Sequence, residues 1–392
     1  MKKTLPLLLL LPALVMGYSL FSLGRPGEPQ SPVDARGHAL GNTVLGLWDT
    51  HNLSLLNPAN LAGLSFSTLT LSAGFELNSY TVAAGTSDYA TQDLPNLQFA
   101  FALSDSFALA LGIQNRQSWK FLYSTTVYDD VDPTEEIGTA TVEGKGQVNA
   151  LNLAFGYKPS DNLGLGLRVT GLMGDPHEIW TVDFTDDDYI DTTDTLTSEI
   201  RGFAIAAGLN LRFSTLNVGA YFEYPILGEV TKITESGYGE VSREEVSFGY
   251  PANLGLGIGW QPNAQFSITA DFRYDLWSGF TIDDTELGYN DAWHAGLGVE
   301  FIPTTRYNAI FLARMPWRLG GYYETLYDSP TASPFNEWGV TAGTGFFVGE
   351  NDESSIDFAF QYAQRGALAE NNLEEKFLRF YLTFNGAENW FE

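Results

Sequence analysis

The stretch FSITADFRYDLW (residues 266–277) alternates apolar and polar side chains along its length. Successive strand residues point to opposite faces, so Phe266, Ile268, Ala270, Phe272, Tyr274 and Leu276 would share one face, and Ser267, Thr269, Asp271, Arg273 and Asp275 the other. The same alternation recurs at residues 151–158 and 378–384. One face suits lipid and the other suits water, as in strands that cross a membrane. An amphipathic sandwich shows the same alternation, so the connections between strands must decide.

The spacing of such segments predicts how the strands are connected. We expect strands near residues 65–80, 96–103, 106–123, 146–158, 162–182, 197–213, 216–227, 246–260, 265–280, 290–302, 306–323, 336–348, 354–364 and 375–386. Every second connection is a tight turn and the others are long and polar. Short turns on one rim and long loops on the other are typical of bacterial outer-membrane barrels. The predicted fold is all-β, a transmembrane antiparallel β-barrel of about 14 strands.

Aromatic residues support the same interpretation, because Trp and Tyr gather at the two membrane interfaces. One predicted girdle, beside the short turns, contains Phe107, Tyr157, Phe213, Trp260, Phe266, Phe301, Tyr307 and Phe347. The other, toward the long loops, contains Trp119, Trp180, Tyr224, Trp277, Trp293, Tyr322 and Trp338. The weakest strand is the eleventh, where Pro316 interrupts the ladder and predicts a bulge or kink.

The beginning of the chain predicts export. Met1, Lys2 and Lys3 precede an apolar run, which ends in small residues at Gly17 and Ser19. This layout is typical of a secretory signal peptide, so we expect residues 1–19 to be removed and the barrel to reside in the bacterial outer membrane, in contact with its lipid. No later stretch has the roughly 20 apolar residues that a membrane helix needs.

Composition excludes several classes of partner. Only 20 Lys and Arg residues stand against 48 Asp and Glu residues, which argues against a nucleic-acid partner. The chain has no cysteine, so it has neither a disulfide nor a thiolate metal site. Much of the acid falls in two predicted outer loops, at Asp129, Asp130, Asp132, Glu135 and Glu136, and at Asp183, Asp186, Asp187, Asp188, Asp191 and Asp194. Neither loop has a calcium-binding pattern, and solvated loops that resist aggregation account for both.

The segment ahead of the first strand does not alternate and is rich in Gly, Pro and Asn. It ends in Leu55-Leu56-Asn57-Pro58-Ala59-Asn60-Leu61-Ala62-Gly63. Here the chain resembles the FadL-like outer membrane transport family, whose members place a small N-terminal hatch with an Asn-Pro-Ala motif inside a fourteen-stranded barrel. Asn57, Pro58 and Ala59 match that motif, and residues 34–64 resemble the glycine-rich stretch around it. The resemblance implies a hatch at residues 20–63 and a barrel at residues 64–392. The alternative is that residues 18–63 form a flexible periplasmic tail.

The end of the chain resembles the same superfamily, because YAQRGALAENNLEEKFLRFYLTFNGAENWF (residues 362–391) is similar to its closing hairpin. Two departures concern the substrate and the terminus. Family members that take up fatty acids have apolar helices in their outer loops, whereas the loops here are acidic. The last residue is Glu392, so the usual terminal aromatic is displaced to Phe391.

Catalytic chemistry finds little support in the sequence. The four histidines, His38, His51, His177 and His294, have no metal-type spacing, and no Gly-x-Ser-x-Gly motif occurs. We therefore expect no enzyme activity, no metal and no cofactor.

Charges on the polar faces are the candidate site residues: Arg168, Arg212, Asp271, Arg273, Asp275, Arg314 and Arg379. They either pair across the lumen and fix the strand register, or some arginines receive an anionic head group of a ligand.

Three functions remain open at this point. The resemblance implies a channel for passive uptake of hydrophobic or amphipathic small molecules such as fatty acids, gated by the hatch. The alternative is a barrel that binds other envelope or secreted proteins as an interaction or secretion-associated scaffold. A general porin is the third. A transporter requires a continuous apolar path through the lumen, and a scaffold does not.

Overall fold

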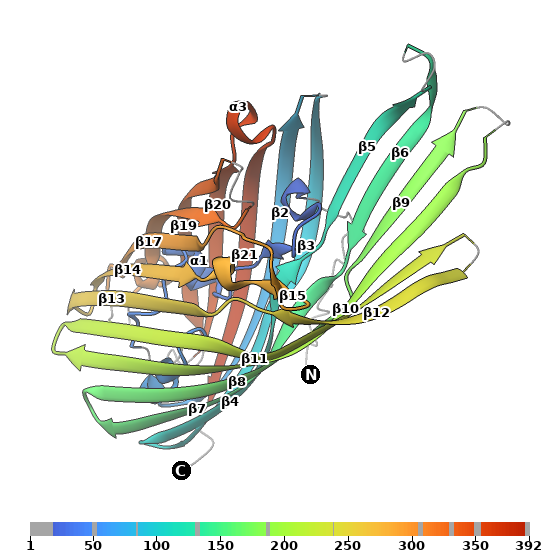
Figure 1. Cartoon of the computed structure of the whole chain (residues 1–392). Helices are drawn as coiled ribbons and strands as arrows, with labels where there is room; N and C mark the ends of the chain where they lie inside the picture. The colour runs from blue at the N-terminus through green and yellow to red at the C-terminus, as the bar shows by residue number, and fades with distance from the viewer. Residues whose placement is uncertain are drawn as a thin grey trace, which may run out of the picture.

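The computed structural model describes residues 19–48, 53–83, 85–129, 134–185, 189–237, 239–304, 309–328, 333–348 and 354–388. These residues form a closed antiparallel β-barrel of 14 strands, with 7 additional strands (Figure 1). The barrel strands are β2 (Ser67–Val82), β3 (Gly85–Ser104), β4 (Phe107–Ser118), β7 (Gln147–Ser160), β8 (Leu163–Gly174), β10 (Thr192–Phe213), β11 (Leu216–Ser236), β13 (Asn253–Asn263), β14 (Phe266–Asp275), β17 (Ala292–Phe301), β18 (Trp317–Leu326), β19 (Phe335–Val348), β20 (Ser354–Arg365) and β21 (Glu374–Glu388). Pairing of β2 with β21 closes the ring.

Alternation along the strands produces the two faces that the sequence predicts. Along β7, Leu151, Leu153 and Phe155 are exposed, whereas Ala150, Asn152 and Ala154 are buried. The exposed apolar positions of neighbouring strands form a continuous outer band, because paired residues on antiparallel strands share a face. No helix among the described residues is long and apolar enough to cross a membrane.

The additional strands extend the barrel on one side, where they rise above the long-connection rim (Figure 1). They are β5 (Phe121–Tyr128), β6 (Glu136–Lys145), β9 (His177–Phe184), β12 (Gly239–Gly249), β15 (Thr281–Ile282) and β16 (Thr285–Glu286), together with β1 (Glu28–Pro29) inside the barrel. Pairing of β6 with β9 and of β9 with β10 makes the extension one sheet. The two acidic loops of the sequence prediction are therefore largely tall β-hairpins, and Asp130, Asp132 and Asp186 to Asp188 lie outside the described residues.

Residues 19–48 and 53–64, here called the luminal segment, lie inside the barrel (blue in Figure 1) and are mostly buried. The segment contains η1 (Leu20–Ser22), β1, α1 (Ala35–Ala39) and η2 (Pro58–Gly63). Three short helices lie elsewhere: η3 (Trp277–Gly279), α2 (Phe311–Arg314) and α3 (Leu368–Asn371). The periplasmic-tail alternative is wrong for the described part of this segment, because its backbone and side chains bond to the barrel wall.

The eleventh strand departs from its predicted range. Residues 309–316 include the helix α2, and the strand β18 begins only at Trp317. Pro316 directly precedes this strand, as expected for a residue that cannot donate to the ladder. Arg314 therefore lies on a short helix at the rim and not on the inner face of a strand, which corrects the prediction for this residue.

Three aromatic residues of the predicted outer girdle face the wrong way for that role. Trp119, Trp277 and Tyr322 are buried, with exposed fractions of 7%, 3% and 7%. Tyr224, Trp180 and Trp338 are exposed, as a girdle requires. Trp277 begins the helix η3, beyond the end of β14, and its ring stacks on Tyr327.

Candidate functional site

The inward side chains of β14, and of Trp277 just beyond its end, lie at successive depths in the lumen. The hydroxyls of Thr269 and Thr43 lie 2.6 Å apart. One carboxylate oxygen of Asp271 accepts hydrogen bonds from the backbone N–H groups of Val44 (2.6 Å) and Leu45 (2.8 Å). Arg273 and Asp275 come next, and Trp277 follows at the outer end. The lumen thus has a floor formed by the luminal segment, a charged middle layer and an aromatic roof.

The Asn-Pro-Ala motif forms part of this floor. The side-chain oxygen of Asn57 accepts a hydrogen bond from the Ala59 backbone N–H (3.0 Å), which caps η2, and its amide donates to the Leu209 carbonyl of β10 (3.2 Å). The wall opposite the motif is glycine: a Cβ added at Gly208 would meet Asn57 and the Ala59 nitrogen. Glycine is needed at that position because the motif backbone lies directly against the strand.

An ion-pair network fastens helix α1 to the wall. The guanidinium of Arg36 donates two hydrogen bonds to the Glu300 carboxylate, at 2.8 and 3.0 Å. Arg318 donates to the same carboxylate and to Asp357, each at 2.6 Å. All four side chains are largely buried, so each charge needs these partners.

Two titratable groups of α1 complete this anchor. The Asp34 carboxylate caps the helix by accepting from the Gly37 N–H (2.8 Å), and burial raises the pKa of Asp34 to about 6. The ring of His38 stacks on Tyr381 with centroids 3.5 Å apart, and its Nδ1 lies 2.8 Å from the Asn42 amide oxygen. Burial lowers the pKa of His38 to about 3, so the ring is neutral at physiological pH.

A second network lies around Glu223, on the inner face of β11. Its carboxylate accepts from Arg116 of β4 (2.6 Å), from Arg168 of β8 and from the Asn253 amide (2.9 Å). Arg168 also donates to the Leu55 and Leu56 carbonyls of the luminal segment. Arg168 is therefore a structural anchor between the wall and the luminal segment.

A third network surrounds Arg365 and Arg379. Arg365 donates to Glu28 of the luminal segment (2.6 Å) and to Glu337 (2.7 Å). Arg379 donates to Glu337 (2.8 Å) and pairs with Glu76. Arg379 is therefore also committed to holding the wall and the luminal segment together.

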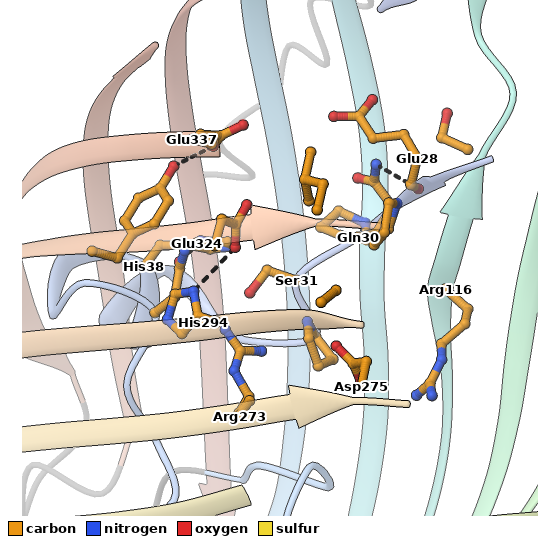
Figure 2. A pocket seen from close by; sticks show the side chains of 18 of the residues that line it. Glu28, Gln30, Ser31, His38, Arg116, Arg273, Asp275, His294, Glu324 and Glu337 are labelled. Atoms are coloured by element: carbon orange, nitrogen blue, oxygen red, sulfur yellow. Dashed lines mark hydrogen bonds and ion pairs between the residues drawn. The ribbon is translucent and has the colours of Figure 1, made fainter. Parts of the chain in front are cut away.

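A cavity of about 190 Å³ lies above the floor (Figure 2). Six carboxylates and five lysine or arginine side chains line it, among them Glu28, Arg116, Arg273, Asp275 and Glu324. Figure 2 shows these side chains converging from the luminal segment and from several strands. The middle of the lumen is therefore strongly polar but nearly neutral in net charge.

Aromatic side chains roof the cavity on the long-connection side. Trp277 stacks on Tyr327 with ring centroids 3.7 Å apart, and Phe21 packs edge-on against Tyr327 at 5.5 Å. The Tyr327 hydroxyl donates to the Gly27 carbonyl. This roof ties the beginning of the luminal segment to the long connections, so a solute from that side must displace aromatic rings.

The barrel wall has a seam between β3 and β4. These strands pair from Ser104 and Phe107 up to Asn96 and Gln114, and above that point β3 pairs only with β2. The freed edge of β4 pairs instead with β1 of the luminal segment, with Glu28 opposite Ser118. Residues on both sides of the seam line the cavity, and the Asp93–Lys120 ion pair crosses it.

The height of the seam follows from the β2 register. Asn96 lies opposite Ser72, and Leu77, still exposed and apolar, lies further along β2 toward the long-connection rim. The strands thus separate within the outer part of the apolar band.

The structure sorts the seven candidate charges into different roles. Arg168, Asp271 and Arg379 bind the luminal segment or the wall, as described above. Arg212 is exposed near the short turns, where its guanidinium lies 5.9 Å from the Trp48 ring. Arg314 is on α2, whereas Arg273 and Asp275 line the cavity together.

Sequence reasoning missed the carboxylates that pair with these arginines, Glu223, Glu300 and Glu337. All three stand on the inward face of a strand, and two lie between outward apolar residues, for example Glu223 between Phe222 and Tyr224. A search for charges flanked by apolar residues would have found Glu223 and Glu300.

The fold of the barrel is similar to that of solved FadL-like outer-membrane barrels. A FadL homologue of Pseudomonas aeruginosa superposes with a TM-score of 0.68 at 13% identity, over 92% of this chain and 99% of that chain. The toluene transporter TbuX of Ralstonia pickettii gives 0.58 at 14%, over 91% and 98%. The toluene transporter TodX of Pseudomonas putida gives 0.58 at 14%, over 93% and 99%. At these identities the likeness concerns the fold.

The chain belongs to the BamG family, whose model matches residues 16–392. No curated protein matches the sequence.

Proposed function

We propose that this protein is an outer-membrane channel for passive uptake of hydrophobic or amphipathic small molecules such as fatty acids, gated by residues 20–63 as a hatch. Residues 1–19 would be removed as a signal peptide, and the long-connection rim would face outward. The solved barrels of this fold described as toluene transporters and a FadL homologue support the proposal by analogy.

The observation that carries the proposal is the seam between β3 and β4. It joins the central cavity to the outer apolar band through a gap in the β3–β4 ladder, which the Asp93–Lys120 ion pair bridges and which β1 of the luminal segment covers by pairing with β4. A molecule in the cavity could leave sideways into the membrane once that ion pair separates and β1 moves away from the β4 edge. Movement of the luminal segment as a hatch would therefore open this route.

The polarity along the route favours amphipathic molecules over pure hydrocarbons. The aromatic roof and the outer band are apolar, but the cavity between them is lined by charges. Among the described residues there is thus no continuous apolar path, and by the criterion set out from the sequence this absence counts in favour of the scaffold. A hydrocarbon alone would desolvate these charges without compensation, whereas a polar head group can bond to them.

The test is uptake of a fluorescent long-chain fatty acid by liposomes that contain the refolded protein. Because the chain has no native cysteine, Asp93→Cys/Lys120→Cys can be joined by a short, reducible bifunctional thiol reagent. We expect saturable uptake by the native protein, a loss after cross-linking and recovery on reduction. The control joins Leu97→Cys to Ile113→Cys, which already pair across the closed part of the same strands. Absence of uptake by the native protein contradicts the channel.

A second candidate is a scaffold that binds envelope or secreted proteins. It is favoured by the tall sheet of β5, β6, β9, β10, β11 and β12, which stands beyond the rim on one side (Figure 1). The uptake experiment separates the two, since a scaffold gives no saturable uptake with native, cross-linked or reduced protein.

A further inference from the structure

Two luminal charges have no direct partner among the described residues. The Nε of Arg273 is buried without a hydrogen bond, and Arg273 makes no ion pair with any described residue. The carboxylate of Asp275 interacts with Arg116 and Arg273 only through longer-range charge. Arg168, Arg318, Arg365 and Arg379 all pair directly with carboxylates.

Both unpaired groups face the same space. They occupy adjacent inward positions on β14, about 6.6 Å apart along the strand, and both line the central cavity (Figure 2). The next inward residues are committed elsewhere: Asp271 bonds to the luminal segment and Trp277 belongs to the roof. A cation and an anion are thus presented side by side to a cavity of about 190 Å³.

The charge balance around the pair constrains what can bind. With Arg116, Arg168, Glu223 and Glu324, the two residues form a group of three cations and three anions, and the Nδ1 of His294 lies 3.0 Å from Glu324. A ligand with net charge would unbalance this group in a poorly solvated space. A zwitterion leaves the group neutral and supplies the two missing partners.

We propose that Arg273 and Asp275 form a binding site for a small zwitterion, an α-amino acid with an apolar side chain. Its carboxylate accepts hydrogen bonds from the Arg273 guanidinium and its ammonium donates to Asp275. Its side chain packs against Tyr221, Tyr250 and Trp277, which also line the cavity. The inference names a substrate class for the proposed uptake function and rests on it.

The test compares three probes with one skeleton: L-phenylalanine, 3-phenylpropionate, which lacks the ammonium, and 2-phenylethylammonium, which lacks the carboxylate. Titration calorimetry on the full chain in detergent measures their affinities. We expect phenylalanine to bind at least about tenfold more tightly than either relative, since a charge-assisted hydrogen bond is lost in each.

Near-isosteric variants assign the two ends. Asp275→Asn should weaken the binding of phenylalanine at least about tenfold and leave the affinity for 3-phenylpropionate unchanged. Arg273→Gln should weaken the binding of phenylalanine and of 3-phenylpropionate and leave the affinity for 2-phenylethylammonium unchanged. Arg201→Gln is the control, because Arg201 pairs with Asp175 at an exposed site outside the cavity. Equal affinities for phenylalanine and 3-phenylpropionate in the native protein would overturn the site, as would an Asp275→Asn variant that binds phenylalanine normally.

The failure of the site and the failure of the channel are separable. If phenylalanine binds with the predicted affinities for probes and variants but no probe is taken up by liposomes, the channel is rejected and the site is retained. Fatty-acid uptake without phenylalanine binding rejects the site and retains the channel.

Discussion

Replacing Gly298 by alanine should detach helix α1 from the barrel wall. A Cβ at Gly298 would stand 2.5 Å from the Leu40 carbonyl oxygen, 2.6 Å from Leu40 Cβ and 2.7 Å from Leu40 Cα. Two of these atoms are backbone, so the end of α1 must retreat by roughly 1 Å to reach ordinary contact. Overpacking costs about 1–3 kcal/mol, and weakening the 3.1 Å bond from the Gly41 N–H to the Thr341 hydroxyl adds about 1 kcal/mol.

A destabilisation of about 3 kcal/mol raises the undocked population about 150-fold. The assay is thiol labelling of Val33→Cys, a buried position beside α1 in a chain that has no other cysteine. The matched control is Gly171→Ala on β8, where the nearest atom to an added Cβ is 3.8 Å away. Labelling of the Gly298→Ala protein at the control rate would refute the close packing of α1 on β17.

Three further predictions concern the buried charges and the roof. Arg318→Gln leaves two buried carboxylates without their shared partner and should destabilise the protein by about 3–5 kcal/mol in urea unfolding; the exposed Arg201→Gln should cost at most about 1 kcal/mol. Burial lowers the pKa of His38 from 6.5 to about 3, so the neutral ring stabilises the folded protein fully above pH 6.5. This stabilisation is lost as the pH falls toward 3, by about 1.4 kcal/mol per pH unit. His38→Gln should flatten the acid dependence of Val33→Cys labelling, and an unchanged profile would show that another group titrates. Trp277→Ala removes a roof ring and should raise ion conductance in planar bilayers, whereas conductance equal to that of the native protein would place the main barrier below the roof.

The barrel was predictable because its signals are local. Alternation along each strand and the order of short turns depend on neighbours in sequence, and both appear in β7, β14 and β21 as expected. The hairpins above the rim were missed because β5, β6 and β12 carry polar residues on both faces, and alternation is then absent. The eleventh strand was placed too early because alternation at Ile310 and Leu312 also occurs beside a short helix.

The site was less predictable because its contacts are distant in sequence. Parity identified Asp271, Arg273 and Asp275 as inward residues, but which charge lacks a partner depends on strands across the lumen and on the luminal segment. Arg168 shows the difficulty. Its inward direction follows from the alternation along β8, but its contacts with Glu223 on β11 and with the Leu55 carbonyl depend on how β8, β11 and the luminal segment are placed in space.

The claim that the luminal segment gates transport can be tested by locking it. Arg36→Cys/Glu300→Cys, joined by a short reducible reagent, fixes α1 to β17 at the place where the native side chains lie 2.8 Å apart. Uptake of the fluorescent fatty acid should stop in the locked protein and return on reduction. Undiminished uptake with α1 locked would contradict gating by the luminal segment.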